Sequence, residues 1–141
     1  MRGKKSLVVF IFFNILRSKG GVIVLDSSGE IKIHDILEDA DVPFEEEYTF
    51  PDLISSSGRH LRFDFAVFRD DGELDYLIEF NGKQHYSPSP KFGGSKGLYR
   101  QQYNDNKKRQ YCLKNNITLV TIPYFDENRI SYEYILRAAG Y

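Results

Sequence analysis

Two carboxylates, Asp64 and Glu79, have a setting that would let them bind a divalent cation. Asp64 belongs to the segment 61–68, where apolar and polar residues alternate as they do in a half-buried β-strand. Glu79 interrupts the apolar segment 74–80, where an unpartnered charge would be costly to bury. If the two segments pair, the carboxylates repel each other unless a cation lies between them, and Mg²⁺ prefers oxygen ligands.

A hairpin is predicted between these two segments. Asp71-Gly72 is a strong signal for a two-residue turn. This turn and a four-residue loop over 70–73 give the same register, which places Asp64 directly opposite Glu79 with Cβ atoms about 5 Å apart. The competing interpretation is that one acid is solvated, or that Arg62 screens the pair.

The elements around the hairpin predict a small α/β domain with a mixed sheet. Ser27 and Glu30 predict a helix start, as a cap residue and as a negative charge in the first turn. A helix over 98–114 and a strand over 117–122 predict a parallel strand reached through a helical crossover. One face of the first hairpin strand is expected to carry its apolar residues, Leu61, Phe63, Phe65 and Val67. The remaining expectations are a short strand over 47–50, a loop over 51–58, a long irregular loop over 81–97 and a terminal helix over 133–139.

Charge is unevenly distributed along the chain, although the net charge is only −1. Residues 26–79 hold sixteen acids and four bases, whereas residues 83–114 hold eight bases and one acid. An acidic region attracts divalent cations and a basic segment attracts phosphate, although both could simply be solvated surface. The single cysteine, Cys112, excludes an intramolecular disulfide and a cysteine-rich zinc site, and favours a reducing, cytoplasmic compartment.

Residues 1–26 are set apart from the domain expected over 27–141. Residues 1–6 are basic and residues 7–16 nearly all apolar, as in the first two regions of a signal peptide, but no small-residue cleavage site follows. The apolar run is also shorter than the ~20 residues that cross a bilayer. We expect an apolar extension, or an extra strand or helix, and no membrane partner.

The residues around the two acids resemble the PD-(D/E)XK nuclease superfamily. The motifs are Arg62-Phe63-Asp64-Phe65 and the later segment 77–86, which reads LIEFNGKQHY. Glu30, in an early helix, precedes these motifs, and Asp105 and Lys108, in a later helix, follow them. This order is similar to that of the superfamily. The resemblance covers roughly residues 27–124. More narrowly, the chain is similar to phage-encoded endonucleases related to very-short-patch repair endonucleases and archaeal Holliday-junction resolvases.

This resemblance implies a restriction-endonuclease-like core and an endonuclease that hydrolyses DNA phosphodiester bonds with Mg²⁺ or Mn²⁺. Asp64 and Glu79 would bind the metal, with Glu30 as a further ligand or water anchor. Asn81 and Asp105 would support the ligands. Glu47 could do the same, or it could simply end the acidic run 45–47. A homing, nicking or junction-resolving role is open, and a homodimer would suit a junction cutter.

The chain departs from the superfamily at Asn81, where a lysine is usual. Lys83, Gln84 and His85 are the candidates for that lysine's role, which is to orient or polarise the attacking water. The branch of the superfamily that uses Gln or His there fits this chain better. His85 would act as general base or protonate the leaving oxygen, unless it is a loop histidine bonded to the backbone.

The basic segment is the expected DNA-binding surface. Its candidate residues are Lys83, Lys91, Lys96, Arg100, Lys107 and Lys108. Lys108 could equally be solvated, and Asp105 could form a surface pair with Arg109 instead of supporting the site. Three tyrosines at helical spacing are expected in the core, with base stacking as the alternative: Tyr99, Tyr103 and Tyr111.

The Asn81 departure also supports a rival hypothesis. A chain that keeps the fold without the lysine could be a catalytically inactive nucleic-acid-binding module. A carboxylate-rich interaction protein with no nucleic-acid role is a third hypothesis, which the basic segment disfavours.

Overall fold

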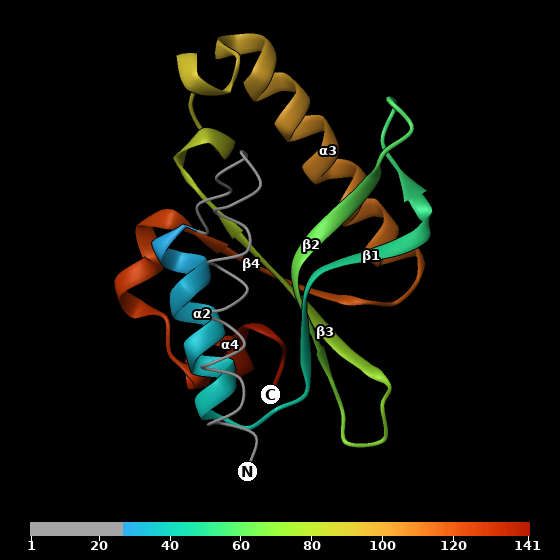
Figure 1. Ribbon diagram of the computed structural model, residues 1–141, viewed down its shortest axis with the longest axis vertical. Helices are drawn as coiled ribbons and strands as arrows, with labels where there is room; N and C mark the ends of the chain where they lie inside the picture. Colours follow the sequence, from blue (N-terminus) through green and yellow to red (C-terminus); the bar gives the residue numbers. More distant parts are fainter. Residues whose placement is uncertain (1–26) are drawn as a thin grey trace, which may run out of the picture.

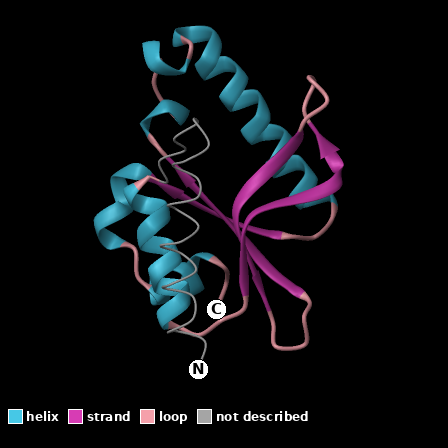
Figure 2. Cartoon of the chain, in the orientation of Figure 1, coloured by secondary structure: helices cyan, strands magenta, loops and turns pink. Residues whose placement is uncertain are grey.

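The computed structural model describes residues 27–141, which form a four-stranded β-sheet with helices on both faces (Figures 1 and 2). The strands lie side by side in the order β1 (Phe44–Ile54), β2 (His60–Phe68), β3 (Leu74–Asn81) and β4 (Thr118–Pro123). The helices are α2 (Ser28–Asp39), α3 (Gly94–Lys114) and α4 (Tyr132–Ala138), with the 3₁₀ helices η1 (Lys83–His85), η2 (Pro90–Phe92) and η3 (Tyr124–Arg129). The extension, strand or helix expected within residues 1–26 lies outside the described residues.

The sheet is mixed, as the sequence predicts. Strands β1, β2 and β3 pair antiparallel, and β4 runs parallel to β3 after the chain has crossed over through α3. The carboxyl ends of β3 and β4 therefore meet at one edge of the sheet, where Asn81 lies opposite Pro123. The α/β class, the central hairpin, the helical crossover and the flanking helices are all confirmed.

Helix α2 begins where the sequence predicts and lies close against β3. Its N-cap is Ser27, whose Oγ accepts a hydrogen bond from the Glu30 N–H at 3.3 Å. Gly29, in the first turn, is buried against Phe80, and a Cβ at this glycine would lie 2.2 Å from the phenyl ring. The absence of a side chain at Gly29 therefore lets the start of α2 approach β3 one residue beyond Glu79.

The hairpin turn differs from the predicted one, but the register near Asp64 is as expected. The Arg69 N–H donates to the Glu73 carbonyl at 2.8 Å, so the loop has three residues, and Gly72 takes a left-handed φ of 89°. A register shift beyond the Val67–Tyr76 pair then compensates for the odd loop length. The pairs Phe65–Ile78 and Ala66–Leu77 match the predicted register because these two irregularities cancel.

The apolar core consists of two clusters, one on each face of the sheet. The cluster under α2 and α4 includes Leu37, Ile135 and Ile78, and the cluster under α3 includes Cys112 and Leu77. Because Leu77 and Ile78 are neighbours in β3, their assignment to different clusters shows that both faces of the central strand are covered.

The expectation that four apolar residues of β2 share one face is wrong. Leu61 and Phe63 belong to the cluster under α3, whereas Phe65 and Val67 belong to the other cluster. The change of face falls at Asp64. On the neighbouring strand Glu47 adopts a left-handed φ of 53° between the pairs Glu46–Phe65 and Tyr48–Phe63, so both strands depart there from regular alternation.

Two other predicted boundaries are corrected. Residues 51–54 were expected in a loop but extend β1, an edge strand where a proline is tolerated because its missing N–H faces no partner. The expected irregular loop over 81–97 contains η1 and η2, and α3 begins at Gly94 instead of Leu98. The terminal helix is confirmed as α4.

Candidate active site

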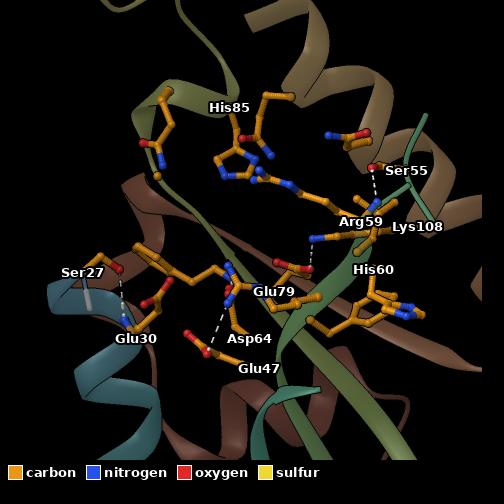
Figure 3. Close-up of a pocket in the computed structure, with 18 of the residues that line it drawn as sticks. Ser27, Glu30, Glu47, Ser55, Arg59, His60, Asp64, Glu79, His85 and Lys108 are labelled. Carbon is orange, nitrogen blue, oxygen red and sulfur yellow. Dashed lines mark hydrogen bonds and ion pairs between the residues drawn. The ribbon is translucent and has the colours of Figure 1, made fainter. Parts of the chain in front are cut away.

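A cleft of about 700 Å³ opens between the first turn of α2, the irregular region of β1 and β2, and helix α3 (Figure 3). Its lining includes all five residues predicted to be catalytic: Glu30, Asp64, Glu79, Gln84 and His85. They come from α2, β2, β3 and η1. The fold therefore gathers residues that are well separated in the sequence into one concave site.

The carboxyl groups of Asp64 and Glu79 meet at the floor of this cleft. Asp64 Oδ2 accepts a hydrogen bond from the Phe80 N–H at 2.7 Å, and Glu79 is only 7% exposed. Burial and then the charge of Asp64 raise the pKa of Glu79 well above its usual value. Burial also raises the pKa of Asp64, although the Phe80 N–H and the charge of Lys108 oppose the rise. The repulsion between two carboxylates this close is relieved by a proton or by a cation.

Lys108 reaches the same floor from helix α3. Its Nζ lies 2.6 Å from Glu79 Oε1, and its side chain is 12% exposed, so the interpretation of Lys108 as a solvated residue is wrong. Arg62 was the residue considered as a possible screen for the acids. Its Nη1 lies instead 3.4 Å from Glu47 Oε2. The cation that partly neutralises the acids is therefore a lysine distant in sequence, and not Arg62.

His85 is oriented by a buried carboxylate. Its Nδ1 lies 2.8 Å from Asp105 Oδ2, and Asp105 Oδ1 accepts a hydrogen bond from Gln101 Nε2 at 3.1 Å. Burial alone would raise the pKa of Asp105, but the hydrogen bond and charge of His85 outweigh it and lower the pKa. Because an ionised carboxylate only accepts, Nδ1 carries the proton and Nε2 of a neutral ring is left as an acceptor. The alternatives for these residues, a backbone-bonded His85 and an Asp105–Arg109 pair, are not what the structure shows.

The two remaining acids predicted around the site lie on its walls. Glu30 lines the cleft from the first turn of α2 and Glu47 from β1 (Figure 3). Asn81 does not line the cleft but ends β3. Within residues 27–141 no three His, Cys, Asp or Glu side chains come close enough together to hold a metal ion. Any metal site built from this part of the chain would therefore depend mainly on the Asp64–Glu79 pair.

The predicted DNA-binding residues divide into two groups. Arg100 and Lys108 line the cleft, whereas Lys83, Lys91, Lys96 and Lys107 do not. Lys107 instead donates a hydrogen bond from Nζ to the Ile54 carbonyl, which ties the end of β1 to α3. The basic segment therefore faces the cleft only along part of its length.

The tyrosines of α3 were expected in the core, and two of them are not there. Tyr99 is 74% exposed and Tyr103 is 52% exposed. Tyr111 is partly buried and packs on Phe50, with ring centroids 5.0 Å apart. The core assignment is confirmed for Tyr111 alone, because only the last two turns of α3 lie over the apolar part of the sheet.

Sequence reasoning missed a second wall of the cleft. Ser55, Ser57, Arg59 and His60, from the tip between β1 and β2, line the cleft together with Phe92 of η2. The tip was predicted as a plain loop because residues 51–54 carry no strand signal strong enough to overcome Pro51. Only the extended β1 carries Arg59 up beside α3.

Two viral proteins resemble the chain. Uncharacterized protein 307L of Invertebrate iridescent virus 6 is 35% identical over 96 residues, which are 64% of this chain and 49% of that protein. Uncharacterized protein 033L of Invertebrate iridescent virus 3 is 32% identical over 109 residues, 74% of this chain and 53% of that protein. The chain thus spans about half the length of the curated relatives it matches. No family model and no solved structure matches the chain.

None of the helices within residues 27–141 is long and apolar enough to span a membrane.

Proposed function

We propose that the chain is a metal-dependent endonuclease that hydrolyses phosphodiester bonds of DNA. The observation that carries this proposal is the meeting of the Asp64 and Glu79 carboxyl groups on the buried floor of an open cleft, with Lys108 beside them. Burial raises the pKa of both acids, and buried acids of this kind are costly to a fold and are concentrated at functional sites. The chain spans about half the length of its curated relatives, so nuclease activity of a protein of their full length is likewise only proposed.

The topology supports assignment to the PD-(D/E)XK superfamily. A central hairpin that carries both acids, followed by a helix and a parallel strand, is the arrangement expected of a restriction-endonuclease-like core. The order of Glu30, Asp64, Glu79 and Lys108 along the chain fits the same assignment.

The two acids suit Mg²⁺ or Mn²⁺. Their mutual repulsion contributes to the raised pKa of Glu79, and a divalent cation would remove this repulsion. Mg²⁺ keeps several waters and accepts one or two carboxylates, so the small ligand set within residues 27–141 is sufficient. Such a cation, when bound, polarises a phosphoryl oxygen and lowers the pKa of a bound water. Glu30, on the wall of the cleft, would anchor a water beside it.

Lys108 would supply the positive charge that Asn81 does not. Its ammonium group already lies at the floor of the cleft, 2.6 Å from Glu79 Oε1. When Glu79 binds a metal, Lys108 can donate instead to the attacking water or to a phosphoryl oxygen. A lysine from a helix then performs the role usually given to the strand residue two positions after the second acid.

His85 would move the proton. Its Nε2 is left as an acceptor because Nδ1 donates to Asp105, and the residue lines the cleft beside Gln84. An imidazole held in one orientation can accept a proton from the attacking water or return one to the leaving oxygen.

A cleavage assay tests the proposal. Purified protein is incubated with supercoiled, branched and single-stranded DNA in Mg²⁺, in Mn²⁺ or in EDTA. We expect cutting that EDTA abolishes and that Asp64→Asn and Glu79→Gln each reduce by at least about 10³-fold. Glu133→Gln, on exposed helix α4, is the matched control and should cut normally. Equal cutting by Asp64→Asn and the wild type would contradict the proposal.

A catalytically inactive nucleic-acid-binding module is the second candidate function. The Lys108–Glu79 contact favours it, because an ammonium group at this position can take the place of a metal. This candidate predicts DNA binding that weakens with salt and no cutting in either metal.

A further inference from the structure

We propose that the cleft binds a single, unpaired DNA strand, with Arg59 of the β1–β2 tip and Arg100 of α3 holding its phosphates and Phe92 stacking on one of its bases. This inference rests on the proposed function and adds its substrate class. It is carried by two unpaired arginines, one exposed ring and the shape of the cleft.

In the described part of the chain, neither arginine side chain has a competing partner. Arg59 lies at the tip between β1 and β2, Arg100 lies on α3, and both line the cleft. No other residue of 27–141 forms a hydrogen bond or ion pair with either guanidinium group. Arg62, by contrast, is paired with Glu47. Guanidinium groups bind phosphate through two parallel hydrogen bonds, so two unpaired ones in a cleft are suited to a polynucleotide backbone.

The wall that carries Arg59 is fixed in place. The Ser55 N–H donates to the Arg59 carbonyl at 2.7 Å, which closes the tip. Lys107 donates to the Ile54 carbonyl, and the Tyr111 hydroxyl donates to Asp52 Oδ1 at 2.6 Å, so α3 holds β1 at two points. The fold therefore holds the end of β1 against α3 before any ligand binds.

Phe92 offers a base-sized apolar surface within the same cleft. Phe92 is 52% exposed although it lines the cleft, and the Lys91 Nζ lies 5.6 Å from the centroid of the Phe92 ring. The backbone that carries the ring is tightly packed, since a Cβ at Gly97 would lie 1.7 Å from the Phe92 carbonyl oxygen. An exposed ring on a fixed backbone is a stacking platform, and a positive charge beside it favours a phosphate-linked base.

The exposed ring of Phe92 favours one strand over two. The cleft of about 700 Å³ has room for roughly one or two nucleotides. In a duplex the bases are already stacked, and exposing one for Phe92 costs the free energy of unpairing and unstacking it. An unpaired strand makes the same contact without that cost. Acids on the floor and arginines on the walls would then place the phosphate of this strand over Asp64 and Glu79.

The test is a binding measurement made in EDTA, so that no cutting occurs. Fluorescence anisotropy compares a labelled single strand, a flap and a blunt duplex of the same sequence, over a range of salt concentrations. The variants are Arg59→Ala, Arg100→Ala and Phe92→Leu. Matched controls outside the cleft are Arg109→Ala on the same helix and Phe125→Leu on η3. Thermal unfolding confirms that each variant is folded.

We expect the single strand and the flap to bind about tenfold or more tightly than the duplex. Each arginine variant should lower single-strand affinity and reduce the salt slope by about 0.7, and Phe92→Leu should weaken binding by roughly five- to a hundredfold. Duplex binding as tight as single-strand binding, or arginine variants that match Arg109→Ala, would overturn the inference. Cutting of duplex DNA with these results would leave the nuclease proposal standing. Single-strand binding without cutting in Mg²⁺ or Mn²⁺ would sink the nuclease proposal alone.

Discussion

Lys108 and a divalent cation compete for the same carboxylate, Glu79. In the metal-free protein the ammonium group lies 2.6 Å from Glu79 Oε1 and lowers the pKa that burial and Asp64 raise. Lys108→Met should remove this competition without leaving a buried charge on the helix. We expect kcat to fall by about 10² or more, because a donor aimed at the reacting phosphate is lost, while Mn²⁺ affinity stays equal or rises. Calorimetric titration of Mn²⁺ and single-turnover cleavage separate the two effects.

Lys114→Met, in the exposed last turn of the same helix, is the control for this variant. A Lys108→Met protein that cuts at the wild-type rate would show that Lys108 is only a counter-ion to Glu79.

Asp64→Asn should make the metal-free protein less sensitive to alkaline pH. Burial raises the pKa of Asp64 and, together with the Asp64 charge, that of Glu79, so the folded state binds more protons than the unfolded chain above about pH 4. Stability is therefore lost as pH rises from about 4 through the raised pKa values. The asparagine keeps an acceptor for the Phe80 N–H but removes one of the two charges.

The size of this effect can be measured by urea unfolding in EDTA between pH 4 and pH 8. We expect Asp64→Asn to lose about 1–2 kcal/mol less unfolding free energy over this range than the wild type. Parallel pH curves for the two proteins would show that the carboxyl groups do not interact. The same substitution abolishes cutting in the nuclease account, so stability and function would move in opposite directions.

His85→Gln should lower kcat by about 10²–10⁴-fold with little effect on DNA affinity. The Asp105 carboxylate holds the imidazole through Nδ1, and a glutamine cannot replace the ring as a proton acceptor. Single-turnover cleavage and DNA binding in EDTA measure the two effects separately. A wild-type kcat in the variant would restrict His85 to a structural role.

At the residue scale, the sequence identifies which residues could take part in catalysis better than it identifies which residues they contact. The register next to Asp64 and Glu79 was predicted correctly, with Phe65 opposite Ile78, because local pattern determines register. Lys108 was recognised as a motif residue, but its contact with Glu79 depends on how α3 crosses the sheet. No local pattern encodes that crossing.

At the scale of elements, the start of α2 positions one wall of the cleft. Gly29 is buried against Phe80, and a Cβ there would lie 2.2 Å from the ring. Gly29→Ala should push the first turn of α2 away from β3, carrying Glu30 with it and disturbing the N–H that Asp64 accepts. We expect a loss of about 1–3 kcal/mol in unfolding free energy and reduced cutting.

Chemical denaturation measures this loss, and Gly72→Ala supplies a control with a different cause. Gly72 has open space around it but a φ of 89°, so its substitution strains the turn without moving α2. Cutting should survive in Gly72→Ala and not in Gly29→Ala. Normal activity in both would show that the position of α2 is irrelevant to the site.

The elements that sequence reasoning placed well are those with strong periodicity or caps. The start of α2, the helix and parallel strand of the crossover, and α4 all carry such signals. The bend near Asp64 does not, because Glu47 has no intrinsic preference for the left-handed backbone that it adopts. The change of face in β2 and the second wall of the cleft follow from that irregular geometry and could not be predicted.

At the scale of the whole molecule, the acidic and the basic regions of the sequence both contribute residues to the lining of one cleft. The acidic half supplies Glu30, Asp64 and Glu79, and the basic segment supplies Arg100 and Lys108. A cleft lined by both acids and cations attracts a divalent ion and a phosphate together, which a uniformly charged surface cannot do. The nearly neutral net charge therefore does not argue against a polyanionic substrate.

The most direct test of this account is the anomalous scattering of Mn²⁺ in crystals of the protein. We predict an anomalous peak between the Asp64 and Glu79 carboxylates, with the Lys108 ammonium group displaced from Glu79 and no peak in Asp64→Asn crystals. A wild-type crystal at saturating Mn²⁺ with no peak there, and with Lys108 still bound to Glu79, would contradict the account.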